Sequence, residues 1–164
     1  SAANLTVTPN LPLYGSSKSI SNYYYAGSLI DVAGSIQTVT VTLTNTSTTP
    51  NTVTSLFDDL STMGAGYTVA ASPAPATTCA GGAVSAPVGA TSFTMTGGVI
   101  PASNGTTAGT CTVTVPVNIP LSAANVGSAT NTIRVGDIMT SQGGNTVPLS
   151  GGVGEPVLNF VFEA

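Results

Sequence analysis

The amino-acid sequence predicts an all-β fold, an immunoglobulin-like antiparallel β-sandwich. Three observations indicate it: the chain is rich in β-branched and small residues, apolar and polar residues alternate in short runs, and clusters of Gly, Pro, Asn and Ser separate the runs. A length of 164 residues suits one domain with a sizeable core. We therefore expect two sheets, with alternate residues of each strand filling the space between them.

Alternation is clearest in residues 39–44, where Val39, Val41 and Leu43 share one face. Leu5 and Val7 show the same pattern before a proline ends the run. Pro116 and Pro120 interrupt one strand, which predicts that this strand lies at an edge or carries a bulge. Further strands are expected at residues 52–57, 66–70, 91–96, 110–119, 129–135 and 157–162.

The pattern divides the chain into two parts. Residues 1–30 contain two early prolines and a loop-rich segment, and we interpret them as an N-terminal strand with an extension. Residues 31–164 form the predicted sandwich. Within it, residues 71–90 are rich in Pro and Gly and are expected to form a long connection that carries Cys79.

Charge is unusually scarce, with 5% of residues charged and a net charge of -4, against about 25% charged residues in an ordinary soluble domain. Two basic residues cannot form a basic patch, so nucleic acid and anionic membranes are poor candidate partners. A weakly charged surface repels its neighbours little, which favours permanent assembly with copies of the same chain. The alternative is one module of a large adhesin whose other parts supply solubility.

Catalysis is not expected. The chain has no histidine and a single lysine, so a His-assisted nucleophile is excluded. Asp58 and Asp59 are adjacent and would face opposite sides of an extended backbone, which argues against a paired-carboxylate mechanism. We expect no cofactor.

Cys79 and Cys111 are the only cysteines. Without histidine or a second cysteine pair, a metal site of zinc type is not expected. A disulfide in an oxidising compartment is the expected state, with two free thiols as the alternative. A bridge closing a loop of this length would stabilise the fold by roughly 4 kcal/mol.

Localisation outside the cell follows from several features. The sequence begins at Ser1, which suggests a removed signal peptide, and no apolar run approaches the roughly 18 residues that span a bilayer. We expect a secreted or cell-surface protein that does not span the membrane. Calcium is a weaker possibility, with Asp58 and Asp59 as candidate ligands and turn capping as their alternative role.

A series of short motifs, weak singly, is recognisable by its order: residues 41–47 (VTLTNTS), 57–60 (FDDL), 78–79 (TC), 96–102 (TGGVIPA), 109–115 (GTCTVTV) and 131–133 (NTI). Over about residues 36–145 this order resembles the DUF11-type immunoglobulin-like repeat domain of bacterial cell-surface proteins. The resemblance implies a cell-surface location, a Cys79–Cys111 bridge and no catalysis. It implies no ligand.

Both ends of the chain offer apolar strands for joining subunits. A strand lent to a neighbouring subunit gives tight, directional contact, and contacts that do not close produce filaments. The alternative for each run is a strand of its own sandwich. The candidate interface residues are Leu5, Val7, Leu11 and Leu13 at the N-terminus and Leu158, Phe160 and Phe162 at the C-terminus.

Tyr23, Tyr24 and Tyr25 form an aromatic cluster that could contact sugar rings or a neighbouring subunit, or place Tyr24 in the core. Two functions therefore remain. The first is a structural subunit of an extracellular filament, pilus-like fibre or surface layer, assembled head to tail through a terminal β-strand. The second is an adhesin module that binds a glycan or host surface.

Overall fold

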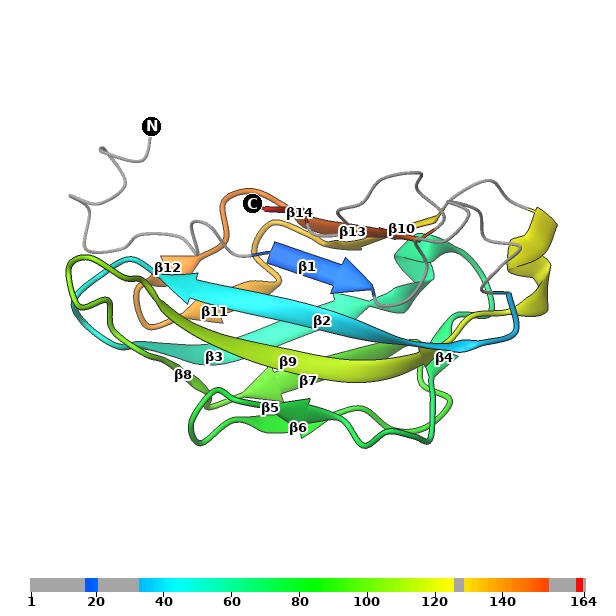
Figure 1. Ribbon diagram of the computed structural model, residues 1–164, viewed down its shortest axis with the longest axis horizontal. Coiled ribbons are helices and arrows are strands. Elements are labelled where there is room, and N and C mark those ends of the chain that lie inside the picture. The colour runs from blue at the N-terminus through cyan, green and yellow to red at the C-terminus, as the bar shows by residue number, and fades with distance from the viewer. Residues whose placement is uncertain (1–16, 21–32, 126–128, 154–161, 164) are drawn as a thin grey trace.

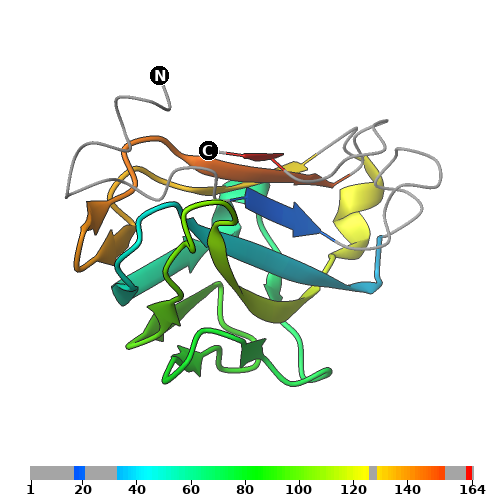
Figure 2. The ribbon, with the colours of Figure 1, turned by 60° about the vertical axis from the view of Figure 1, so that its left-hand side comes forward.

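The computed structural model describes residues 17–20, 33–125, 129–153 and 162–163. Figure 1 shows two layers of antiparallel strands that face each other across a shared interior, and Figure 2 shows the same layers from the side. The predicted fold class, an all-β immunoglobulin-like antiparallel sandwich, is confirmed.

The first sheet is built around one long ladder. β2 (Ile36–Asn45) and β9 (Gly109–Asn118) pair along their whole length, from Ile36 opposite Asn118 to Asn45 opposite Gly109. The other strands extend the sheet on both sides of this pair, in the order β14-β1-β2-β9-β4, with β5 also on β9. They are β1 (Ser17–Ile20), β4 (Thr68–Val69), β5 (Ala76–Thr77) and β14 (Phe162–Glu163).

The second sheet is centred on β3 (Asn51–Asp59), which pairs with β7 (Ser92–Thr96) on one side and with β11 (Ile138–Thr140) on the other. Its order is β12-β11-β3-β7-β6, and β8 also pairs with β3. The short strands are β6 (Ala83–Ser85), β8 (Val99–Ile100) and β12 (Gly143–Gly144).

A separate two-stranded sheet covers the side of the sandwich between the two larger sheets. β10 (Ala129–Ile133) and β13 (Leu149–Val153) pair antiparallel, β13 lies against β1, and β10 lies against β3. Two short 3-10 helices, η2 (Leu60–Met63) and η3 (Leu121–Asn125), follow β3 and β9.

The core lies between the sheets and is made of alternate residues. Val39, Val41 and Leu43 of β2 are completely buried, as the sequence pattern predicted, while the threonines between them are partly exposed. The largest fully buried side chains, from both sheets and the following turns, are Phe93, Leu43, Leu56, Leu60, Met95, Ile100 and Ile119.

The two cysteines form a disulfide. Cys111 lies in β9, Cys79 follows β5, and their Cα atoms are 5.0 Å apart. Both half-cystines are buried. The Thr78 N–H donates to the Thr112 carbonyl at 2.9 Å, so the connection after β5 is also tied to β9 by its backbone.

The expectation that β9 lies at an edge or carries a bulge is wrong, because β9 is internal and its ladder with β2 runs without a register shift. The Pro116 carbonyl accepts the Ala70 N–H at 2.8 Å, which places both backbone groups of Pro116 on the side that faces β4 and β5. Pro116 lies between the β9 residues that pair with these two strands. Proline has no backbone N–H to donate, and at Pro116 this lack falls where the pairing of β9 with β4 and β5 is already interrupted.

Residues 17–20 belong to the sandwich, although the predicted boundary at residue 30 assigns them to an extension. All four residues of β1 pair with β2. In the described part of the chain, no helix has the length and apolarity needed to cross a membrane.

Candidate functional site

A cluster of polar side chains lies where the end of β3 meets β10. We call it the β3–β10 polar cluster, and it consists of Asp58, Asp59, Thr62, Asn131 and Arg134. It brings together segments that are about seventy residues apart in the sequence, as the separation of 73 residues between Asp58 and Asn131 shows. Part of it is inside the protein and part is at the surface.

A bulge in β3 turns Asp58 toward the core. The pairing of β3 with β11 changes register between Met139, which is opposite Ser55, and Thr140, which is opposite Val53. Val53 and Leu56 are both fully buried, so the inward face changes from odd to even positions at this point. The carboxyl group of Asp58 therefore faces the interior and is 0% exposed.

Asn131 faces Asp58 from β10 and is also 0% exposed. Its amide nitrogen Nδ2 has three acceptors: Asp58 Oδ1 at 2.9 Å, Thr62 Oγ1 at 3.0 Å and the Asp59 carbonyl at 3.1 Å. Its amide oxygen Oδ1 is buried and has no hydrogen-bond partner among the described residues. An unsatisfied buried acceptor costs about 1–3 kcal/mol. The cluster therefore fixes the amide nitrogen firmly and leaves the amide oxygen without a donor.

Thr62 holds the cluster to the backbone of both segments. Its hydroxyl donates to the Asp59 carbonyl at 2.9 Å and accepts the Thr132 N–H at 2.9 Å. The orientation of the Asn131 amide is thus set by η2 as well as by β3.

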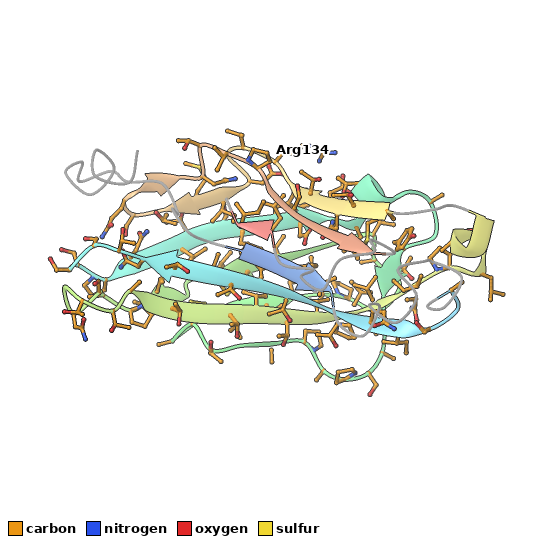
Figure 3. The ribbon with its side chains drawn as sticks, turned by 45° about the horizontal axis from the view of Figure 1, so that its top comes forward. Arg134 is labelled. Atoms are coloured by element: carbon orange, nitrogen blue, oxygen red, sulfur yellow. A yellow bond between two sulfur atoms is a disulfide. The ribbon has the colours of Figure 1, made fainter. Side chains whose placement is uncertain are left out.

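Asp59 points away from Asp58 and lies at the surface. Its Oδ1 accepts the Ser61 hydroxyl at 2.6 Å and the Ser61 N–H at 2.9 Å, and so caps η2. The Ser61 hydroxyl lowers the pKa of Asp59 below its ordinary value of 3.8, the Ser61 N–H and Arg134 add to this, and partial burial opposes it. Arg134 Nη1 is 3.4 Å from Asp59 Oδ2, and Figure 3 shows this arginine at the surface.

The two calcium candidates are therefore separated by the strand: Asp58 is inside and Asp59 is outside. Among the described residues, no group of three or more Asp, Glu, Cys or His side chains is placed to hold a metal ion. Turn capping, the alternative considered for these acids, is what Asp59 does.

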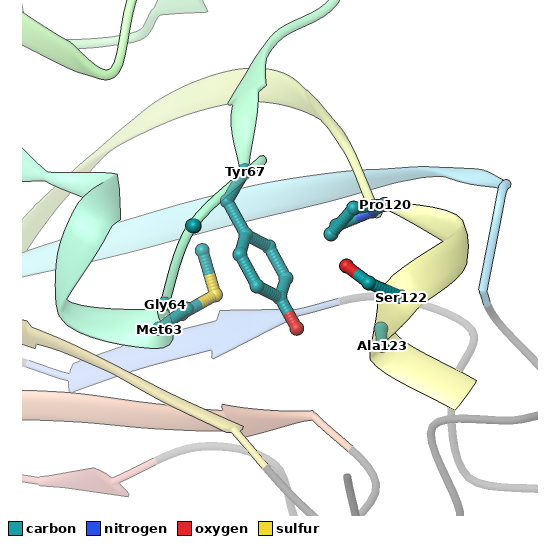
Figure 4. Close-up of a pocket in the computed structure, with 7 residues that line it drawn as sticks. Met63, Gly64, Tyr67, Pro120, Ser122 and Ala123 are labelled. Atoms are coloured by element: carbon teal, nitrogen blue, oxygen red, sulfur yellow. The ribbon is translucent and has the colours of Figure 1, made fainter. Parts of the chain in front are cut away.

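Two shallow pockets lie away from this cluster. The one in Figure 4 has a volume of about 180 Å³, and the Tyr67 ring stands in it between Met63 and the residues of η3. Tyr67 is nearly buried, and burial raises its pKa above the ordinary value of 10.0. The second pocket, also about 180 Å³, lies on the outer side of β5 and β9. Sites for drug-sized ligands are usually about 300–1,000 Å³.

Most predicted interface residues lie outside the described residues. These are Leu5, Val7, Leu11, Leu13, Tyr23, Tyr24, Tyr25, Leu158 and Phe160. Phe162 begins β14, where it pairs with Lys18 of β1.

Sequence reasoning missed Asn131, although a signal was present. Ala129, Asn131 and Ile133 occupy alternate positions of one predicted strand, and all three are buried. A polar residue on an otherwise apolar face marks a side chain that needs a partner in the core. Asp58 gave no such signal, because the bulge that turns it inward is not visible in the alternation.

A protein-family model matches most of this chain. The model of a family described as a domain of unknown function, DUF7933, matches residues 24–152. Comparisons with curated proteins and with solved structures give no match. None of these comparisons names the DUF11 type, so that resemblance stays a prediction.

Proposed function

Because this chain belongs to the DUF7933 family, whose function is unknown, we propose a function on structural grounds: it is a structural subunit of an extracellular filament, pilus-like fibre or surface layer. Copies join head to tail through a terminal β-strand. The chain is not an enzyme. The DUF11-like order of motifs, which implies a cell-surface module, agrees with this proposal.

The observation that carries the proposal is an uncharged threonine face on the first sheet. Every second pair of the β2–β9 ladder joins two threonines: Thr40 lies opposite Thr114, Thr42 opposite Thr112 and Thr44 opposite Thr110. Thr110 is exposed and the other five threonines are partly exposed, while their neighbours along each strand are buried. A face of hydroxyl and methyl groups has no charge to keep copies apart.

The charged residues elsewhere in the described part do little to change this. Asp58 is buried, Asp59 forms an ion pair with Arg134 at 3.4 Å, and Asp137, which is partly exposed, directly precedes β11 of the second sheet. A buried carboxyl group and a surface ion pair contribute little net charge to the exterior. A surface of this kind supports permanent assembly better than free diffusion.

The disulfide supports a location outside the cytoplasm. Disulfides persist in oxidising compartments and are rare in the cytosol. The Cys79–Cys111 bridge therefore fits a non-cytoplasmic protein, and secretion is the more specific form that we propose.

The joint is proposed at the side of β1. In the described part of the chain, β14 pairs with β1 through Phe162 and Glu163, which lie opposite Lys18 and Ser17. β14 is the edge of the first sheet, and a longer strand from another copy would pair at this edge. Strand exchange between copies would extend the first sheet from one subunit to the next.

Electron microscopy of the purified chain tests the proposal. We expect long polymers that resist denaturant. Removal of residues 1–14, or of residues 157–162, should leave monomers if a terminal strand is the joint. Polymers that persist after both deletions would rule out strand exchange.

A second pair of variants tests the threonine face. Thr112→Lys adds a charge to this face, whereas Thr54→Lys adds the same charge to an exposed position on β3 of the other sheet. Only the first variant should weaken assembly. Monodisperse monomers that bind a glycan array would instead support the adhesin alternative.

A further inference from the structure

The loop between β8 and β9 contains the one Asn-Gly dipeptide of the sequence, Asn104-Gly105. In Figure 1 this loop lies at the left-hand end of the sandwich, beside the loop that joins β2 to β3, and the Ser103 N–H donates to the Ser47 carbonyl at 2.7 Å. Asn104 and Gly105 are both exposed. An asparagine followed by glycine is open to attack by its own backbone, because glycine has no Cβ to hinder the approach to its nitrogen.

The side chain of Asn104 is folded over the residues that follow it. Its amide oxygen Oδ1 accepts the Thr106 N–H at 2.9 Å and the Thr107 N–H at 2.6 Å. Two donors on one oxygen draw electrons from the carbonyl carbon Cγ, and they stabilise the negative charge that forms on the oxygen when a nucleophile attacks. The backbone of the loop therefore activates the side-chain carbonyl of Asn104.

The nucleophile in this loop is the backbone nitrogen of Gly105. It lies within the ring that the bond from Thr106 N–H to Asn104 Oδ1 closes, so this bond limits how far the nitrogen and Cγ can move apart. The Gly105 N–H donates to Ser103 Oγ at 3.0 Å, and the Ser103 hydroxyl donates to the Thr107 carbonyl at 3.0 Å. The proton that the attacking nitrogen must lose thus already has an acceptor.

Asn45, at the end of β2, provides a comparison within the same molecule. Its Oδ1 accepts the Ser47 N–H at 3.0 Å, which is the same kind of turn. Its Nδ2, however, donates to the Thr49 carbonyl at 2.8 Å and to the Pro101 carbonyl at 3.1 Å. Asn45 is 4% exposed, and the residue that follows it is a threonine. Asn45 should therefore keep its amide where Asn104 loses it.

From this arrangement we propose that Asn104 and Gly105 form a self-modifying site, where the folded loop promotes conversion of the asparagine to aspartate and isoaspartate. No enzyme is needed, and water is the only co-reactant. The inference does not depend on the proposed assembly, because a monomer and a polymer would both carry the site.

The atoms balance in two steps. The Gly105 nitrogen attacks Cγ of Asn104, a C–N bond forms, the bond from Cγ to Nδ2 breaks, and the proton that Gly105 loses leaves with Nδ2 as ammonia. The product is a cyclic imide between the two residues. Water then opens the imide at one of its two carbonyl carbons, which gives aspartate or isoaspartate, and no group is oxidised or reduced.

The product brings charge to a part of the chain that has none. No charged residue occurs between Asp59 and Arg134 in the sequence. The new carboxylate would lie at one end of the sandwich, in the loop bonded to Ser47. In isoaspartate the backbone continues through the former side chain, which lengthens the loop. The negative charge therefore accumulates at this end with the age of the molecule.

Incubation of the purified, folded chain at mildly alkaline pH tests the inference. Anion-exchange chromatography should resolve a more acidic species that grows with time. Denaturation, reduction and chymotryptic digestion, followed by tandem mass spectrometry, should place the change at Asn104. Compared with a sample taken at the start, the peptide should be heavier by the difference between a hydroxyl and an amino group. Asn45 should be unchanged in the same digest.

The denatured, reduced chain is the control for the role of the fold, because it has the same dipeptide without the hydrogen bonds of the loop. We expect Asn104 to convert at least as fast in the folded chain as in the denatured chain. Slower conversion in the folded chain, or an intact amide, would overturn the inference, since the loop would then protect Asn104.

Matched variants separate the parts of the site. Ser103→Ala removes the acceptor of the Gly105 N–H and should slow conversion severalfold in the folded chain only. Ser47→Ala removes a hydroxyl from the neighbouring loop and should convert at the wild-type rate. Gly105→Ala adds a Cβ beside the attacking nitrogen and should slow conversion strongly in both the folded and the denatured chain.

A wild-type rate in folded Ser103→Ala would count against the inference. Circular dichroism checks that each variant is folded. The comparison of folded and denatured wild type stands even if one of the variants is not.

Discussion

Asn131 Nδ2 donates to Asp58 Oδ1 at 2.9 Å across 73 residues of sequence, and both side chains are completely buried. This contact joins the end of β3 to β10 and closes one side of the sandwich. It also combines the two features that are hardest to place in a core, a carboxyl group and an unsatisfied amide oxygen.

Replacement of Asn131 should destabilise the protein strongly. Asn131→Ala removes the donor to a buried carboxyl group, and we expect the free energy of unfolding to fall by about 2–4 kcal/mol. Thr130→Ala, one position earlier on the exposed face of the same strand, should change it by less than about 0.5 kcal/mol. Urea unfolding measures both, and similar losses in the two variants would contradict the role assigned to Asn131.

Removal of the disulfide should also be costly. The bridge closes a loop between positions 32 residues apart, and we expect the double variant Cys79→Ser/Cys111→Ser to lose about 3–4 kcal/mol of stability. The same loss should follow reduction of the wild type. A melting temperature that reduction does not change would show that the loop is fixed by its hydrogen bonds alone.

The core position Phe93 should be sensitive to truncation. Phe93 is 1% exposed, so Phe93→Ala leaves a cavity, and we expect a loss of about 3–5 kcal/mol. Val88→Ala serves as the control because Val88 is 68% exposed in a loop. Thermal unfolding of the two variants should differ clearly.

Gly109 should not tolerate a side chain. A Cβ atom at this position would overlap the carbonyl group of Pro101, which is itself held by Asn45 Nδ2 at 3.1 Å. We expect Gly109→Ala to disrupt the start of β9 and to reduce the yield of folded protein. Thr110→Ala, at the next and exposed position, should fold normally.

Asp59 should make stability depend on pH in the acid range. Its pKa in the folded protein lies below the ordinary value of 3.8, so its contribution is complete above that value and is lost as the pH falls through the lower, folded-state pKa. The difference in unfolding free energy between wild type and Asp59→Asn should therefore shrink on acidification from about pH 6 to about pH 2. A difference that stays constant with pH would show that the carboxylate charge is not involved.

The long strands were predictable because the alternation of apolar and polar residues that marks them lies within each strand's own sequence. In residues 39–44 and 110–119 the alternation itself separates buried from more exposed positions, with Pro116 as the exception, and β2 and β9 follow it. The short strands β5, β8 and β12 contain two residues each, too few to show any period. They exist because neighbouring strands offer backbone partners, which sequence patterns do not reveal.

The candidate site was less predictable for the same reason. Asp58 faces the core only because β3 shifts register against β11 near Ser55, and that shift is set by a strand about eighty residues away, as the Thr54–Met139 separation of 85 residues indicates. Asn131 carried a visible signal, a polar residue on an apolar face. Its partner Asp58 carried no such signal in the sequence.

Ser17 and Glu163 are directly opposite each other in the β1–β14 pair, so the chain enters and leaves this part of the domain at the same end. A pulling force applied through these two points would open the pair one hydrogen bond at a time instead of shearing all bonds together. Such a peeling geometry is mechanically weak. A domain that has to bear tension along its chain therefore needs its resistance to unfolding in contacts other than the β1–β14 pair.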